Sequence, residues 1–170
     1  EAANVFAAHY SSVSKLTFTA ASDKDTLKDY RSTIKTSKAM PRPYKAMNAD
    51  LTMKELERAL LILDPNKSPG ADGLYGQMLA NLPSTGRDRL LHIMGLSFSQ
   101  GKLPKDWKVA IIIPIKKPGK PGDKVASYRP ISLTSIPCKL MERIHLGRVD
   151  HLLTTTGNYP PEQAAYRKAH

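Results

Sequence analysis

Apolar residues recur at helical spacing in several separate stretches of the chain, and residues 52–63 show this pattern most clearly. Met53, Leu56, Leu60 and Leu63 lie three or four positions apart, so they fall on one face of a helix. We expect that face to be buried, because the positions between these residues are mostly charged. The same spacing predicts further helices within residues 1–20, 74–82, 87–98 and 137–152.

Sequence signals mark where these helices begin and end. Thr52-Met53-Lys54-Glu55 has the pattern of a capping box, in which the Thr and Glu side chains each satisfy an amide of the first turn. Asp64-Pro65-Asn66 is expected to end this helix, because proline disfavours a helical conformation in the residue before it. Asp72 is placed to cap the helix within 74–82, Gly101 to end the one within 87–98, and Pro137 to begin the last.

The period changes after residue 107. Residues 109–115 are a continuous run of mainly β-branched apolar residues, which is typical of a strand buried on both faces. Pro114 indicates a sheet edge or a strand end, since proline cannot donate to a ladder. Residues 116–122 are rich in Pro, Gly and Lys and predict a loop, and residues 128–135 predict a return strand. The expected result is a β-hairpin with a long basic tip.

The charge of the chain is concentrated around this hairpin. The sequence has 26 Lys and Arg against 15 Asp and Glu, a formal charge of +11, which favours a polyanionic partner. Residues 102–129 hold eight basic and two acidic residues, so they contribute +6 of that charge. A second basic stretch lies within residues 22–49, a polar and apolar-poor segment that we expect to be a linker or a loosely held surface. Both stretches are also compatible with ordinary solvated surfaces.

Several classes of protein are disfavoured by the sequence. An apolar content of 41% over 170 residues suits one compact domain rather than a disordered chain. We find neither a membrane-spanning run nor a signal-peptide pattern, and a lone Cys138 excludes an internal disulfide and is expected to be a small buried residue. Phosphate-binding P-loop and serine-hydrolase motifs are absent, and the scattered histidines do not predict a metal site.

The hairpin is the strongest candidate for chemistry. Lysine acts as a point charge toward phosphate, whereas Arg129, near the start of the return strand, offers a planar fork for two phosphate oxygens. The hairpin therefore suits a triphosphate or a nucleic-acid backbone. The alternative is a lysine-rich exposed edge that prevents aggregation.

Blocks of sequence in a fixed order resemble the reverse transcriptases of non-LTR, LINE-like retrotransposons. The resemblance covers nearly the whole chain and is specific because the blocks occur together. The blocks are Phe6-Ala7-Ala8-His9-Tyr10, Thr52 to Leu56, Asn66 to Gly73, Trp107 to Lys120, Ser127 to Thr134, Lys139 to Arg143, and Gln163-Ala164-Ala165-Tyr166-Arg167. In the last block, Ala165 and Tyr166 stand where the family has Gly and Phe.

The resemblance implies an α+β fold that is part of a right-hand polymerase, with a fingers hairpin packed with helices and most of the palm and thumb absent. It divides the chain into a helix plus basic linker over 1–49 and a partial reverse transcriptase domain over 50–170.

The resemblance also implies roles for individual residues. Three would bind the phosphates of the incoming dNTP, namely Arg129, Lys117 and Lys116, and two would add electrostatic attraction for the backbone, namely Lys120 and Lys124. The loop that would lie along the template contains Pro69, Gly70, Asp72 and Gly73; the alternative for this loop is an ordinary turn between helices.

In the intact family, an RNA template is copied into DNA from a DNA primer, with dNTPs and Mg²⁺. The aspartates of this two-metal chemistry lie downstream in the family, and this sequence contains no Asp-Asp pair. We therefore expect no catalytic residue and no metal site in this chain, and no polymerase activity from the chain alone. The family's use of a nicked chromosomal target implies a nuclear location.

Two other hypotheses remain open. The chain could be a non-catalytic RNA- or single-strand-binding remnant of a retroelement, kept for its affinity for the nucleic-acid backbone. It could also be a relic without function, whose fingers strands leave apolar surface uncovered.

Overall fold

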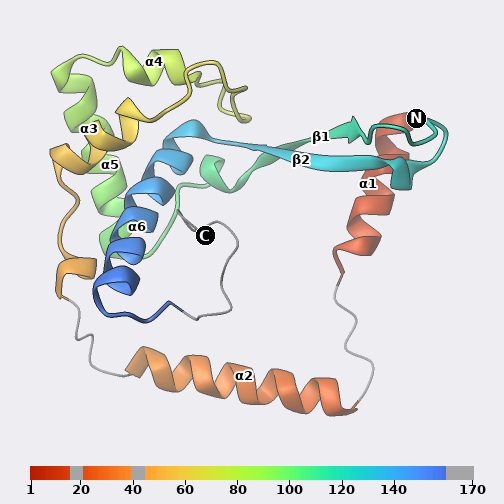
Figure 1. Cartoon of the computed structure of the whole chain (residues 1–170), viewed down its shortest axis with the longest axis horizontal. Coiled ribbons are helices and arrows are strands. Elements are labelled where there is room, and N and C mark those ends of the chain that lie inside the picture. Colours follow the sequence, from red (N-terminus) through yellow and green to blue (C-terminus); the bar gives the residue numbers. More distant parts are fainter. Residues whose placement is uncertain (16–20, 40–44, 160–170) are drawn as a thin grey trace. The chain divides into compact units, whose positions relative to one another are not determined.

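The computed structural model describes residues 1–15, 21–39 and 45–159. They form two compact units. The hairpin unit contains the described residues within 1–39 and residues 112–131; the helical unit contains residues 45–111 and 132–159. Helices and a two-stranded antiparallel sheet together make the chain α+β, as predicted (Figure 1). The predicted domain boundary near residue 49 stays a prediction.

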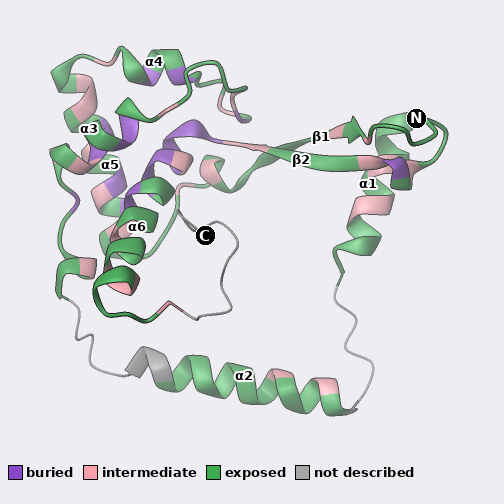
Figure 2. Ribbon diagram, viewed as in Figure 1, coloured by how far each residue is buried: buried purple, intermediate pink, exposed green. Residues whose placement is uncertain are grey.

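The helical unit is built from four α-helices: α3 (Met53–Leu61), α4 (Gly76–Ala80), α5 (Ser84–Gln100) and α6 (Ile136–Thr155). Two short 3-10 helices, η1 (Lys45–Asn48) and η2 (Asp106–Lys108), lie in the connections. The buried residues gather where α3, α5 and α6 face one another (Figure 2). Leu56, Met94 and Leu140, one from each of these helices, are almost completely buried. The helical face predicted from the spacing in residues 52–63 therefore forms the core.

The first helix of this core begins as the sequence predicts. The Thr52 hydroxyl accepts a hydrogen bond from the Glu55 amide at 3.3 Å, and the Thr52 amide donates to Glu55 Oε2 at 2.8 Å, which completes the capping box. α3 ends at Leu61, a little ahead of the predicted Asp64-Pro65-Asn66 stop. The predicted end of α5 at Gly101 is confirmed, since that glycine adopts the left-handed φ of 62° typical of a helix C-terminus.

The last helix also starts close to the predicted position. α6 begins at Ile136, and Pro137 lies in the first turn, where its missing amide proton costs no helical hydrogen bond. The Ser135 hydroxyl caps the helix by accepting from the Cys138 amide at 3.4 Å.

The prediction that Asp72 caps the helix within 74–82 is wrong. Asp72 Oδ1 accepts from the Leu74 amide at 3.2 Å, which makes a local turn, and α4 begins only at Gly76 with Tyr75 at its N-cap. Between Asp72 and the helix, Gly73 turns the chain with a left-handed φ of 68°. An aspartate can favour a turn by the same side-chain hydrogen bonding that would otherwise cap a helix.

The elements of the hairpin unit are α1 (Ala2–Val13), α2 (Ala21–Ala39), β1 (Ala110–Lys116), η3 (Val125–Ser127) and β2 (Tyr128–Thr134). The first two residues of β1 and the last three of β2 belong to the helical unit. The predicted helix within 1–20 is confirmed as α1. Phe6 of this helix packs edge-on against Tyr128 at the start of β2, with ring centroids 5.0 Å apart. This aromatic contact joins α1 to the base of the hairpin tip.

Helix α2 occupies much of the segment 22–49, which we expected to be a linker or a loosely held surface, and the sequence did not predict this helix. The side chains of residues 22–36 are largely exposed, so no apolar face revealed the helix in the sequence. Three hydroxyls that could have disrupted it, from Thr26, Thr33 and Thr36, each donate to a carbonyl four residues earlier in the same helix.

The prediction of a strand buried on both faces is also wrong. Ile113 and Ile115 of β1 are 39% and 51% exposed, and Ile131 of β2 is 40% exposed. Burial of both faces requires a layer on each side of a sheet, and the described residues of the hairpin unit leave these side chains partly exposed. Figure 2 shows the hairpin almost entirely in the colours of exposed and intermediate residues.

Candidate nucleic-acid interface

The pairing of the two strands sets which way the basic side chains face. The Lys117 amide donates to the Ser127 carbonyl at 2.8 Å, and β1 (110–116) and β2 (128–134) have equal lengths. This register places Lys116 across from Tyr128, Ile115 across from Arg129, and Pro114 across from Pro130.

Alternation along the strands then separates the cations onto two faces. Side chains two residues apart share a face, and directly opposed residues lie side by side. Arg129 therefore lies on the same face as Lys117, as its diagonal neighbour, whereas Lys116 belongs to the other face. The predicted triphosphate-binding set is thus divided by the sheet.

Lys117 is held in place by the end of the hairpin. Its ammonium donates to the Ala126 carbonyl at 2.9 Å, and the residue is half-buried. One of its three donors is used by this contact, which leaves two for a ligand. Arg129 is exposed and forms no ion pair within the part of the chain that the structure describes.

The other face is organised around Tyr128. Its hydroxyl donates to the Gly122 carbonyl at 3.1 Å, which draws the loop back toward the strand. A Cβ added at Gly122 would lie 3.8 Å from the Lys116 ammonium, so this lysine sits beside the returning loop. Lys116 is exposed, and its cationic group lies away from the face of Arg129.

The tip of the hairpin is ordered by backbone hydrogen bonds. The Lys120 amide donates to the Lys117 carbonyl at 3.3 Å, and the Ser127 amide donates to the Lys124 carbonyl at 2.9 Å. Gly119 permits the turn with a left-handed φ of 69°. The side chains of Lys120 and Lys124 are exposed, as expected for residues that attract a nucleic-acid backbone.

The predicted template loop belongs to the helical unit. Gly70 is buried, and a Cβ there would lie 2.6 Å from both the Ser135 nitrogen and the Thr134 carbonyl carbon. This glycine is therefore required by the close approach of the loop to the start of α6. Gly73 is exposed, with no atom within 4 Å of an added Cβ, so it leaves room for an external strand. Pro69, just before Gly70, and Asp72, just before Gly73, are half-buried.

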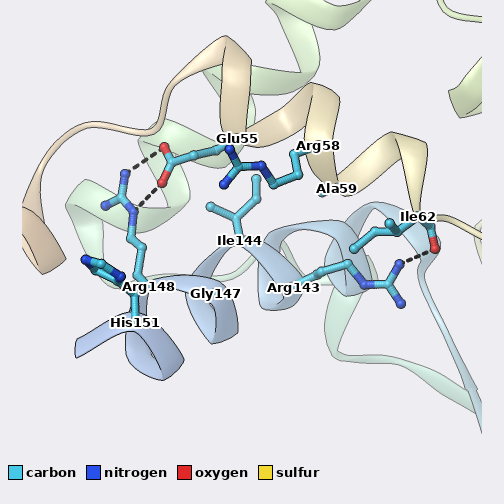
Figure 3. Close-up of a pocket in the computed structure, with 9 residues that line it drawn as sticks. All are labelled: Glu55, Arg58, Ala59, Ile62, Arg143, Ile144, Gly147, Arg148 and His151. Carbon is cyan, nitrogen blue, oxygen red and sulfur yellow. Dashed lines mark hydrogen bonds and ion pairs between the residues drawn. The ribbon is translucent and has the colours of Figure 1, made fainter. Parts of the chain in front are cut away.

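The sequence did not reveal the polar cluster around Arg148, which joins α6 to the start of α3. Its guanidinium binds both oxygens of Glu55, with Nε–Oε1 at 2.6 Å and Nη2–Oε2 at 2.9 Å (Figure 3). It also donates to three carbonyls of the segment before α3, those of Met47, Ala49 and Asp50. Glu55 was identified only as a capping residue, and 93 residues separate the pair, so no local pattern could connect them.

Arg148 and its surroundings shift the pKa values of two nearby groups, Glu55 and His145. Hydrogen bonds from Arg148 are the main reason that the pKa of Glu55 falls from 4.5 to about 2, and those from Thr52 add to the effect. His145 stacks on Phe98 with ring centroids 4.7 Å apart. Burial, followed by the nearby Arg148 charge, lowers the pKa of His145. Both groups support the packing of α6.

Other candidate chemistry is not supported by the described residues. Cys138 is buried, as predicted, and burial raises the pKa of its thiol, so it is a poor nucleophile. The described part of the chain has no group of three or more His, Cys, Asp or Glu side chains suited to a metal ion. No helix in the same part is long and apolar enough to span a membrane. The predicted Gln163–Arg167 block lies outside the described residues.

Several curated proteins that the chain resembles are named as RNA-directed DNA polymerases. It is 36% identical over 120 residues to the probable RNA-directed DNA polymerase from transposon BS of Drosophila melanogaster. It is also 36% identical over 124 residues to the RNA-directed DNA polymerase from mobile element jockey of the same species. Each match covers 71% of this chain and 13% of the relative.

A more distant relative extends this set beyond Drosophila. The Retrovirus-related Pol polyprotein from type-1 retrotransposable element R1 of Bradysia coprophila is 29% identical over 126 residues, which are 74% of this chain and 12% of that protein. No model of a known protein family matches the chain.

These matches place the chain among polymerases of nucleic acids. More narrowly, it belongs with the RNA-directed DNA polymerases of LINE-like, non-LTR retrotransposons, which confirms the resemblance seen in the sequence. It spans about 13% of the length of the first curated relatives that it matches.

Proposed function

We propose that this chain is the part of a LINE-like reverse transcriptase that binds the template and the phosphates of the incoming dNTP. The observation that carries the proposal is the arrangement of Arg129 and Lys117 on one face of the hairpin, without a carboxylate partner among the described residues. The curated relatives, which are named as RNA-directed DNA polymerases, support it. In the intact protein the hairpin would form the fingers of a right-hand polymerase.

The two cations have complementary tasks in this proposal. The Arg129 guanidinium grips two oxygens of the triphosphate, because its donors form a planar fork. Lys117, held by the Ala126 carbonyl, adds a positioned point charge for the same phosphates. Lys116, Lys120 and Lys124 then attract the polyanion from the other face and the tip.

The loop over residues 69–73 contacts the template in this proposal. Gly73 is the position at which a strand approaches the backbone, since nothing lies within 4 Å of a Cβ added there. Gly70 supports the loop from inside, against Ser135. Transfer of the nucleotidyl group needs metal-binding carboxylates from elsewhere, so we assign binding rather than catalysis to this chain.

Binding of RNA and of a dNTP, measured separately, tests the proposal. The purified chain should bind a fluorescein-labelled RNA, and a dNTP should bind the wild type much more tightly than it binds the double variant Lys117→Gln with Arg129→Gln. Lys54→Gln removes an exposed charge from α3 and is the matched control. Loss of dNTP binding in the control and the double variant alike would contradict the proposal.

The same measurement distinguishes the second hypothesis. A non-catalytic RNA-binding remnant would bind RNA with a strong salt dependence and show no dNTP binding that depends on Arg129. The position of Arg129 beside Lys117 favours the dNTP-binding function, because a backbone contact alone would not require a lysine held against a carbonyl.

A further inference from the structure

Helix α2 carries its positive charge in one line along its length. The basic residues within its described side chains, which we call the α2 stripe, are Lys24, Lys28, Arg31 and Lys35. They follow one another at intervals of four, three and four residues, so they lie within about 60° of arc around the helix axis. All four are exposed, and Figure 2 shows most of α2 in the colour of exposed residues. The stripe therefore presents one cation at each helical turn over about 16 Å.

The acidic residues of α2 lie off this stripe. Asp25 and Asp29 are about 100° and about 140° around the axis from Lys24, and Asp23 is about 100° away in the opposite direction. Only Lys28 has an acid three or four positions away, Asp25, and no ion pair joins these two within the described chain. Like charges at this spacing destabilise a helix, so a polyanion bound along the stripe would relieve repulsion between its members.

An exposed aromatic ring borders the stripe. Tyr30 is 68% exposed, and its ring takes part in no aromatic contact with another described residue. It lies about 100° around the axis from Arg31, the next residue of the chain. A ring face is therefore open beside the line of cations. Unpaired bases stack on such rings, whereas the bases of a duplex already stack on one another.

A helix with basic residues can instead lie on an anionic membrane, and the apolar residues of α2 argue against that partner. The large apolar residues among its described side chains are Leu27, Tyr30 and Ile34, which span about 60° of arc. This is narrower than the stripe of about 100° that a helix buries in an apolar phase. Cations in line beside an open ring suit a single nucleic-acid strand better than a lipid surface.

We propose that α2 binds single-stranded RNA, with backbone phosphates along the α2 stripe and a base stacked on Tyr30. The choice of RNA rests on the proposed function, whereas the polyanion-binding geometry does not. This contact involves neither the hairpin cations nor the loop over residues 69–73, so it is open to a separate test.

Anisotropy of a fluorescein-labelled oligouridylate, titrated with the full chain at several salt concentrations, provides that test. Lys28→Gln with Arg31→Gln removes two cations from the middle of the stripe. It should weaken binding about tenfold or more at about 0.1 M salt and lower the slope of log affinity against log salt by about 1.4, which is about 0.7 for each lost contact. The matched control, Lys54→Gln with Arg89→Gln, removes two exposed cations from α3 and α5 and should weaken binding much less.

A rearranged variant separates the stripe from the net charge. Arg31→Thr with Thr33→Arg moves one cation about 160° around α2 and leaves the composition of the chain unchanged. Thr33 is exposed, and its hydroxyl donates only to the Asp29 carbonyl of the same helix. This variant should bind the oligouridylate about fivefold more weakly at about 0.1 M salt, with a slope lower by about 0.7.

Two substitutions of Tyr30 test the stacked base. Tyr30→Ala should weaken binding about fivefold, at the lower end of what one stacked base contributes, and should leave the salt slope unchanged. Tyr30→Phe keeps the ring and should bind as the wild type does. Circular dichroism melts should show that every variant folds.

Three outcomes would overturn the proposed α2 contact. The first is wild-type RNA affinity in the rearranged variant, because net charge alone would then explain binding. The second is equal affinity in Tyr30→Ala and Tyr30→Phe. The third is a stripe variant that keeps its RNA affinity but no longer binds vesicles of phosphatidylserine and phosphatidylcholine that the wild type binds, which would indicate a membrane surface.

Binding of a dNTP judges the proposed function separately, since the α2 variants should bind it as the wild type does. Loss of dNTP affinity in the hairpin double variant, with wild-type RNA affinity in the α2 variants, would uphold the proposed function and overturn the α2 contact. Weaker RNA binding in the α2 variants, with normal dNTP binding in the hairpin double variant, would support the α2 contact and contradict the proposed function.

Discussion

The guanidinium of Arg148 holds the carboxylate of Glu55 by two hydrogen bonds, and the same carboxylate completes the capping box of α3. One side chain thus fixes the start of α3 and its position against α6. The arginine side chain is only 11% exposed, so the pair is shielded from much of the screening that weakens surface ion pairs. The stability of the helical unit should therefore depend strongly on it.

Arg148→Ala should destabilise the helical unit by about 3 kcal/mol, because it leaves Glu55 and three backbone carbonyls without their donor. Urea denaturation followed by circular dichroism measures the change. Arg148→Lys keeps the charge but loses the planar fork of donors, so its free energy of unfolding should lie between those of the wild type and Arg148→Ala. A loss below about 0.5 kcal/mol in Arg148→Ala, as for a surface substitution, would show that the pair contributes little.

Acid should weaken the helical unit through Glu55. The folded-state pKa of about 2 lies below the ordinary 4.5, so the carboxylate stabilises the fold fully above pH 4.5. This contribution is lost as the pH falls from 4.5 through about 2. Urea midpoints measured across this range should fall more for the wild type than for Glu55→Gln. Parallel curves for the two proteins would contradict the assignment.

Gly70→Ala should destabilise the chain by about 1–3 kcal/mol, because its Cβ would overlap the backbone at Ser135, where no flexible side chain can yield. Gly95→Ala is the control, since nothing lies within 4 Å of a Cβ there and alanine is the better helix former within α5. Thermal melts of both variants check the prediction. Equal melting temperatures would show that the loop can move away from α6.

Arg129 and Lys117 should act together, whereas Lys116 should act separately. In a double-mutant cycle on dNTP binding, Lys117→Gln and Arg129→Gln should couple by about 0.5–3 kcal/mol, as groups that share one ligand do. Lys116→Gln and Arg129→Gln should be additive within about 0.5 kcal/mol. Coupling of similar size in the two cycles would contradict the separation of the faces.

The chain by itself should not extend a primer on an RNA template with dNTPs and Mg²⁺. Two-metal transfer needs clustered carboxylates, and the sequence has no Asp-Asp pair. Radiolabelled primer extension is the measurement, and an intact reverse transcriptase provides the positive control. Extension above the background of a Lys117→Gln, Arg129→Gln preparation would refute this expectation.

Local signals predicted the elements whose residues interact with near neighbours in sequence. The Thr52–Glu55 capping box, the Gly101 stop and the hairpin all depend on contacts within a few residues or one turn. α2 escaped prediction because it has no apolar stripe, and the burial of β1 was overestimated because a β-branched run does not say what covers it.

The candidate site divides in the same way. Arg129 and the lysines were found from charge and residue type, but their separation onto two faces needed the register of the strands. Gly70 was linked to the template, whereas the structure shows a contact with Ser135, 65 positions later, that no local pattern encodes. Arg148 and its contacts with Glu55 depend on the pairing of α3 with α6.

The opposition of Pro114 and Pro130 in the hairpin has a consequence for solubility. The backbone amide of Lys117 points toward the partner strand, and so do the amides at every second residue from it and from Ser127. Pro114 and Pro130 fall at the alternate positions, so their nitrogens point toward the outer edges of the hairpin. Each edge therefore lacks a donor at the same level, next to exposed isoleucines, which are Ile113 and Ile115 on β1 and Ile131 on β2. A third strand therefore cannot form an unbroken ladder with either edge, which opposes the pairing of hairpins through their exposed strands.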